Sequence, residues 1–179
     1  SLCNSIKDKV MLASTIILII SLLLDGILSN YLPYLVNNLS LFTPLLTLVS
    51  IFLIYPFFKK KEISYFIIVF LLGIIYDLLY TNLLFFNAVL FLCIAIITMY
   101  IYKNLEVNAT KLIIYLIIII TAYESLTGLI LFIYNIVPVT IPKVLYKITH
   151  SLLLNIIYGE LLYGIIKVIP KKYKKISIN

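Results

Sequence analysis

The chain of 179 residues is 64% hydrophobic and has a mean hydropathy of +1.18. Soluble domains are about 45–50% apolar, so this composition excludes an ordinary water-soluble domain and predicts a protein embedded in lipid. The net charge of +7 comes from 14 lysines and no arginine against seven acids, which excludes phosphate clamps of the arginine type. Because the lysines cluster beside apolar runs, we expect membrane lipids rather than nucleic acid as their partners.

Six apolar runs approach the length of a membrane span, since about 20 residues cross roughly 30 Å of hydrocarbon. They cover residues 10–28, 39–58, 63–80, 83–102, 112–134 and 145–169. Little chain remains between them, so we predict an all-α membrane protein with a single six-helix domain over residues 6–175.

The first run follows Lys7 and Lys9 and lacks a small-x-small cleavage site, so it is expected to be a retained helix rather than a signal peptide. Four polar residues of this helix are spaced 7, 4 and 4 residues apart, which places them on one face. They are Ser14, Ser21, Asp25 and Ser29.

The third run carries Gly73 four residues before Asp77, again on one helix face. A tight turn at 57–62 joins the second run to this one, and a short turn at 80–83, with Asn82 suited to the bend, leads to the fourth. Two longer connections, 29–38 and 135–143, carry proline and tyrosine and are expected at the headgroup level.

The fifth and sixth runs carry further polar stripes, and Asn108 or Thr110 is expected to cap the fifth helix. On the fifth run the stripe is Thr121, Glu124, Ser125 and Gly128. On the sixth it is Ser151, Asn155 and Gly159, with Glu160 and Gly164 alongside.

The lysines predict the orientation. One side of the predicted bundle holds 12 of the 14 lysines, and the other holds only Lys143 and Lys147. The positive-inside rule therefore places both termini in the cytoplasm, as an even number of spans requires.

Four of the seven acids lie inside the apolar runs, where an ionised group costs at least about 2.5 kcal/mol near the bilayer centre. Asp25 and Asp77 are expected near the outer interface, in reach of water or of Lys143, Lys147 or His150. Glu124 and Glu160 lie deeper. Small and polar residues at these spacings favour helix–helix seams that bind the acids; the alternative is a polar cleft or a groove for a partner helix.

Catalysis and metal binding find little support. His150 is the only histidine, and the two cysteines, Cys3 and Cys93, lie far apart in the sequence. No transition-metal ligand set, nucleophile–base pair or disulfide is expected. We therefore predict no catalytic residues, no metal and no cofactor.

The segment GIIYDLLYTN, with Gly73 and Asp77, resembles the G-x-x-x-D-L-L signature of the MreD family of bacterial rod shape-determining membrane proteins. The first span LLLDGILSNYLPYL and the final span LLLNIIYGELLYGIIKVI, with its basic tail, are also similar to that family. One departure is the turn Tyr80-Thr81-Asn82, which lacks the glycine or proline that often follows the aspartate in the family.

The resemblance implies a six-helix bundle similar to the substrate-binding S-components of energy-coupling factor transporters. It also implies a non-enzymatic scaffold of the elongation machinery (elongasome) in the bacterial cytoplasmic membrane, which supports peptidoglycan synthesis and cell shape. The implied partners are an MreC-like single-span protein and, through it, MreB, RodA and a penicillin-binding transpeptidase.

Two alternatives stay open. The chain is also compatible with an S-component that binds a vitamin-like molecule, although Ala13 stands alone where an Ala-x-x-x-Ala pattern is common. A proton- or cation-coupled transporter that uses Glu124 and Glu160 is the other alternative.

Overall fold

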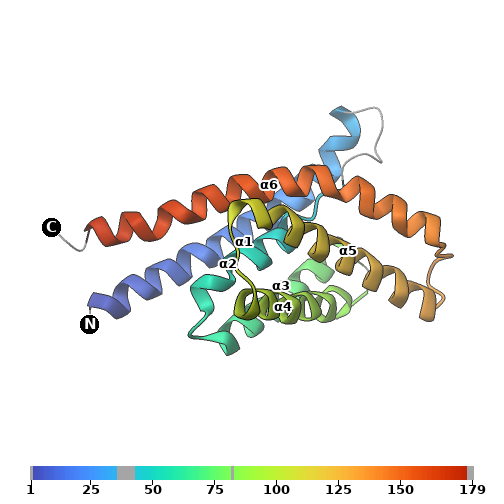
Figure 1. Ribbon diagram of the computed structural model, residues 1–179. Helices are drawn as coiled ribbons and strands as arrows, with labels where there is room; N and C mark the ends of the chain where they lie inside the picture. Colours follow the sequence, from blue (N-terminus) through green and yellow to red (C-terminus); the bar gives the residue numbers. More distant parts are fainter. Residues whose placement is uncertain (1, 36–42, 82, 177–179) are drawn as a thin grey trace.

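The structure is a computed structural model that describes residues 2–35, 43–81 and 83–176. These residues form six helices and no strand (Figure 1). The helices are α1 (Leu2–Leu35), α2 (Leu46–Phe58), α3 (Glu62–Tyr80), α4 (Phe86–Asn104), α5 (Ala109–Ile133) and α6 (Ile141–Ile176). The all-helical prediction is therefore confirmed.

Five of these helices are long and apolar enough to cross a membrane: α1, α3, α4, α5 and α6. Helix α2 has 13 residues, so at about 1.5 Å per residue it is roughly 20 Å long, shorter than the hydrocarbon layer. The chain has the character of a multi-pass membrane protein.

The predicted second span, 39–58, is wrong in its first part. Residues 43–45 are not helical, and 39–42 lie outside the described residues. Pro44 gives the physical reason, because a proline pushes the residue before it away from helical geometry and has no N–H to donate. The signal was present in the sequence as Thr43-Pro44.

Other boundaries also differ from the prediction. Helix α1 continues to Leu35 rather than ending at residue 28, and α4 begins at Phe86 rather than residue 83. Helices α5 and α6 begin three and four residues earlier than predicted, at Ala109 and Ile141. The predicted bend residue Asn82 lies outside the described residues.

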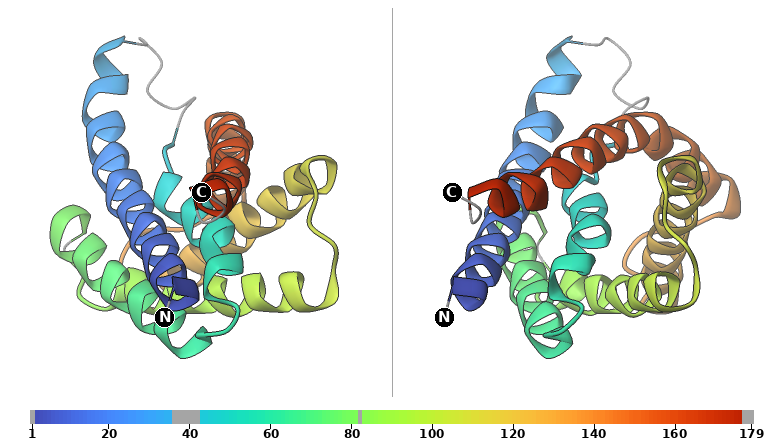
Figure 2. Two further views of the ribbon diagram at one scale, coloured as in Figure 1. Left: turned by 90° about the vertical axis from the view of Figure 1, so that its left-hand side faces the viewer. Right: turned by 60° about the vertical axis from the view of Figure 1, so that its left-hand side comes forward.

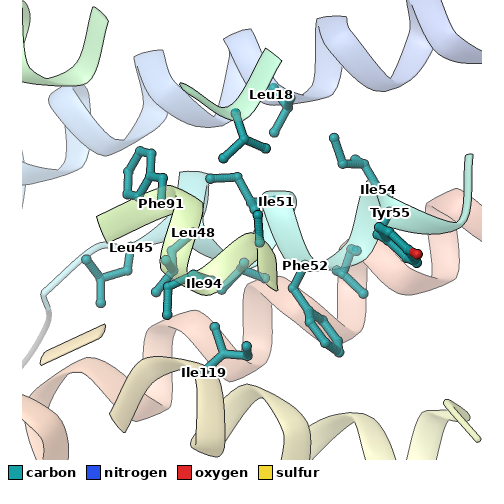
Figure 3. Packing of buried hydrophobic residues seen from close by; sticks show 14 of the residues in the cluster. Leu18, Leu45, Leu48, Ile51, Phe52, Ile54, Tyr55, Phe91, Ile94 and Ile119 are labelled. Atoms are coloured by element: carbon teal, nitrogen blue, oxygen red, sulfur yellow. The ribbon is translucent and has the colours of Figure 1, made fainter. Parts of the chain in front are cut away.

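Helix α2 is the centre of the bundle and contacts α1, α3, α4 and α6. Figure 2 shows the other helices arranged around it. Eleven of its 13 residues are buried, as expected for a helix that is apolar on all sides. In Figure 3, Ile51 and Phe52 of α2 pack among Leu18 of α1, Ile94 of α4 and Ile119 of α5.

Helix α1 begins and α6 ends on the same side of the bundle (Figures 1 and 2). We call this side, where α2 leads to α3 and α4 leads to α5, the Lys end, after Lys59–Lys61 and Lys103. There Lys103 forms an ion pair with Glu62 at 2.8 Å, which joins the last turn of α4 to the first residue of α3. The opposite side, which holds Asp25 and Asp77, is called the Asp end.

Candidate functional site

Asp25, on α1, caps the N-terminus of α2. Its Oδ1 accepts the backbone N–H of Leu46 at 2.7 Å, and its Oδ2 accepts the backbone N–H of Thr47 at 2.9 Å. The hydroxyl of Thr47 donates to the same Oδ2 at 2.6 Å. The first N–H groups of a helix have no partner within the helix, and a carboxylate there also complements the helix dipole.

Asp77, on α3, caps the N-terminus of α4 in the same way. The backbone N–H of Asn87 lies 2.9 Å from both carboxylate oxygens, and the backbone N–H of Ala88 donates to Oδ2 at 3.3 Å. The side-chain amide of Asn87 and the hydroxyl of Thr81 donate to Oδ1 at 2.8 and 3.0 Å. Asp77 therefore ties the two helices of this hairpin together.

The two caps have a common cause. The residues that precede α2 and α4 are Leu45 and Phe85, and neither offers a side-chain cap. In both hairpins, an aspartate of the preceding helix supplies the missing acceptor. We expected Asp25 and Asp77 to reach water or a lysine, but both are buried. Asp25 accepts its hydrogen bonds from α2, and Asp77 accepts its hydrogen bonds from α4 and from Thr81 at the end of α3.

Asn155, on α6, supports the non-helical segment before α2. Its Oδ1 accepts the backbone N–H of Leu45 at 2.7 Å, and its Nδ2 donates to the carbonyl of Thr43 at 2.8 Å. The backbone N–H of Thr43 donates to the carbonyl of His150 at 3.3 Å. Non-helical backbone within a membrane is stable only where protein satisfies its polar groups, and Asn155 does so here.

Tyrosines join these caps to the other helices. The hydroxyl of Tyr123 on α5 donates to Oδ1 of Asn87 at 2.7 Å, and the hydroxyl of Tyr80 donates to the carbonyl of Leu22 on α1 at 2.7 Å. The hydrogen bonds of the Asp end therefore form separate clusters that together link α1 to α2 and α3, α2 to α6, and α4 to α3 and α5.

Glu124, on α5, is buried but caps no helix. The next helix, α6, begins at Ile141 and runs alongside α5, so the N-terminus of α6 is not at Glu124. The hydroxyl of Ser151 lies 3.4 Å from its Oε1. The same hydroxyl makes a closer hydrogen bond with the carbonyl of Lys147, and a hydroxyl has only one proton to donate. Glu124 is thus the least satisfied buried acid of the Asp end.

A cavity of about 540 Å³ opens among these residues. The charged residues that line it are Asp25, Glu124 and Lys147. The aromatic and amide groups that line it are Tyr76, Tyr80, Phe86, Asn87 and Tyr123. Volumes of roughly 300–1,000 Å³ are typical of small-molecule sites, so the cavity is large enough to admit a ligand.

At most of the predicted glycine seams, residues of other helices of the same chain lie against the glycine. A Cβ on Gly73 would overlap the backbone of Ala88, so α3 and α4 approach closely there. A Cβ on Gly128 would meet Val144, and one on Gly159 would meet Leu116. These three glycines serve contacts within the bundle, as small residues do between membrane helices.

Other members of the predicted stripes take no part in the caps. Ser29 is exposed and lines the cavity, whereas Ser125 is exposed and does not line it. Glu160 lies on α6 away from the cavity lining, and its Oε1 is buried without a hydrogen bond to a described residue. A Cβ on Gly164 would meet nothing within 4 Å. Gly164 therefore packs against no other helix among the described residues.

Several residues of these clusters escaped the sequence analysis. Thr47, Asn87 and Tyr123 give no periodic signal, because their partners are carboxylates and amides on other helices. The sequence also did not predict the contacts of Ser21, whose hydroxyl lies 2.5 Å from that of Ser50 and 2.6 Å from that of Tyr158. The only sequence signal was that Ser21 shares a helix face with Asp25.

Within the described part of the chain, no three His, Cys, Asp or Glu residues are placed to hold a metal ion. Comparison with protein-family models finds no match, and no curated protein or solved structure is significantly similar to the chain. The arrangement of the Asp end is therefore what bears on function.

Proposed function

We propose that this chain is a non-enzymatic membrane scaffold of the MreD type, which binds an MreC-like single-span protein in the bacterial cytoplasmic membrane. The observation that carries the proposal is the hairpin of α3 and α4. The two residues of the resemblance, Gly73 and Asp77, act there as a pair: Gly73 allows close approach of the helices, and Asp77 caps α4.

This geometry supports an architectural role for the motif. The carboxylate of Asp77 is buried and accepts five hydrogen-bond contacts from Thr81, Asn87 and Ala88. A general acid or base needs a free position toward its substrate, whereas the oxygens of Asp77 are committed to the hairpin. Asp25 is committed to α2 in the same way.

In the proposed membrane arrangement, the chain crosses six times, with α2 as a short central crossing and the Lys end in the cytoplasm. Lysines at that end follow the positive-inside rule. The start of α1 and the end of α6 lie on the same side (Figure 1), which supports an even number of crossings.

Gly164 marks the face that we propose for the partner helix. It is exposed on α6, and its neighbours Leu161, Ile165 and Val168 are exposed as well. A small residue on a lipid-facing helix lets another helix approach closely. Through an MreC-like partner, the scaffold would be linked to MreB, RodA and a penicillin-binding transpeptidase.

The test is partner identification in the native host. The tagged chain is expressed at its native level, extracted in mild detergent, and the proteins that co-purify are identified by mass spectrometry. We expect an MreC-like single-span protein. A pair of ATPases with a coupling membrane protein would replace the scaffold function with that of a transporter S-component.

A Gly164→Leu variant sharpens this test, because a large side chain on an exposed face blocks a partner without filling a cavity. Gly164→Leu is expected to lose the partner while retaining its own fold, and Ile165→Leu serves as the matched control. Equal recovery of the partner with both variants would show that it binds elsewhere.

A further inference from the structure

The three helical hairpins each carry an acid in the first helix, but only two of these acids are used to hold the fold. Asp25 caps α2 and Asp77 caps α4. Glu124, the acid of the third hairpin, is 5% exposed and has only the long contact from Ser151. A buried carboxylate without strong hydrogen bonds is costly, so its retention here calls for a partner that the fold does not supply.

The groups that line the cavity of about 540 Å³ divide into two kinds. Asp25, Asn87, Tyr80 and Tyr123 already donate or accept hydrogen bonds within the fold. Glu124 has none of comparable quality. A ligand in this cavity would therefore meet one buried carboxylate with a free acceptor oxygen.

A positive charge, Lys147, attracts this carboxylate from a distance without forming an ion pair with it. Lys147 lines the same cavity, yet no ion pair joins it to Glu124; within the described residues, the lysines in ion pairs are Lys103 and Lys111. Lys147 is exposed. The cavity thus presents a negatively charged hydrogen-bond acceptor, Glu124 on α5, and a positively charged hydrogen-bond donor, Lys147 on α6.

Aromatic residues also line the cavity. Tyr76 contacts Tyr80 and Phe91 edge to face, with ring centroids 4.9 and 5.3 Å apart, and Tyr123 lies beside Phe91 at 6.2 Å. Aromatic faces attract an ammonium group, and more strongly where water is excluded. Tyr76 and Tyr123 are among the residues that line the cavity.

We infer that this cavity binds a small zwitterionic group, with its ammonium on Glu124 and its anionic group on Lys147. A ligand with only negative charge would face the carboxylates of Glu124 and Asp25, and a ligand with only positive charge would face Lys147. A zwitterion satisfies both charged groups at once. The chemistry is shared by the phosphoethanolamine headgroup of a lipid and by free amino acids, and it does not depend on the scaffold function proposed above.

The first experiment measures lipid retention. The full chain is purified in mild detergent, and bound lipid is counted by native mass spectrometry during titration with phosphatidylethanolamine or phosphatidylglycerol. We expect phosphatidylethanolamine to bind about tenfold or more tightly, because only its headgroup carries an ammonium for Glu124. Glu124→Gln is expected to remove this preference, and Glu160→Gln, which changes an acid outside the cavity, is expected to keep it.

The second experiment uses soluble probes, glycerophosphoethanolamine and L-leucine, and follows the thermal unfolding midpoint of the same variants. A saturable rise in the midpoint for wild type but not for Glu124→Gln, without a lipid preference, would identify a free solute as the ligand. Lys147→Met changes an exposed residue, so the variant is expected to fold normally and to bind either ligand more weakly.

The inference is overturned if wild type shows neither a lipid preference nor a saturable response to the soluble probes. It is also overturned if Glu124→Gln keeps the wild-type preference. Neither result bears on the MreC-like partner, which is proposed to bind α6 near Gly164, so the two proposals fail separately.

Discussion

The carboxylate of Asp77 accepts both the backbone N–H and the side-chain amide of Asn87, at 2.9 and 2.8 Å, across the turn between α3 and α4. Asn87 is the second residue of α4, so the bond fixes where that helix begins. Asp25 and Thr47 repeat the arrangement at the second residue of α2. Two of the three hairpins of the bundle are closed by the same device.

Replacement of Asp77 by asparagine should destabilise the protein by about 2–3 kcal/mol, because the charge that strengthens these hydrogen bonds is lost and an amide N–H₂ would face donors. The measurement is the thermal or denaturant unfolding midpoint of the purified chain in detergent. Glu106→Gln is the matched control, since Glu106 is exposed in a surface ion pair with Lys111 at 3.5 Å, and surface pairs contribute little. Equal midpoints for the two variants would contradict the capping role.

Gly73→Ala should destabilise the hairpin by about 1–3 kcal/mol, as overpacking of a tight contact does. The added methyl group would overlap the backbone of Ala88, which cannot move without separating α3 from α4. Gly164→Ala adds the same atom where nothing lies within 4 Å and should leave stability unchanged or slightly raised. The two unfolding midpoints measured side by side decide the matter, and a shift of similar size in both variants would refute the close contact.

Asn155→Leu should destabilise the protein by about 2–4 kcal/mol, because the N–H of Leu45 and the carbonyl of Thr43 would lose their partners. Hydrogen exchange followed by mass spectrometry should show faster exchange over the peptide that contains residues 43–47. Asn104→Leu is the comparison, since Asn104 is exposed and bonds only to the carbonyl of Tyr100. Unchanged exchange over 43–47 in Asn155→Leu would mean that this amide does not hold the segment.

The orientation proposed for the bundle is tested by labelling single cysteines in intact cells with a membrane-impermeant maleimide. In a background without Cys3 and Cys93, Lys143→Cys at the Asp end is expected to react, because the lysine-rich end faces the cytoplasm. Lys60→Cys is expected to react only after the cells are opened. Labelling of Lys60→Cys in intact cells would reverse the orientation.

The sequence predicted the local part of the site. Helical spacing placed Gly73 and Asp77 on one face of a helix, and the short turn after it predicted a hairpin. Asn108 caps α5 as one of the two predicted residues, with its Oδ1 accepting the N–H of Lys111 at 2.9 Å. These features depend on residues a few positions apart, where chain geometry leaves few options.

By itself, the sequence determined the all-helical class, the long apolar helices and the uneven distribution of lysine, because lipid requires each spanning segment to satisfy its own backbone. Only the tertiary structure decided that α2 is short and central, that Asp25 caps it from 21 residues away, and that Asn155 supports its entry. It also decided that Glu124 is left beside a cavity. Hydrogen bonds between distant helices depend on how the helices pack, and periodicity along one helix carries no record of the polar group that faces it from another.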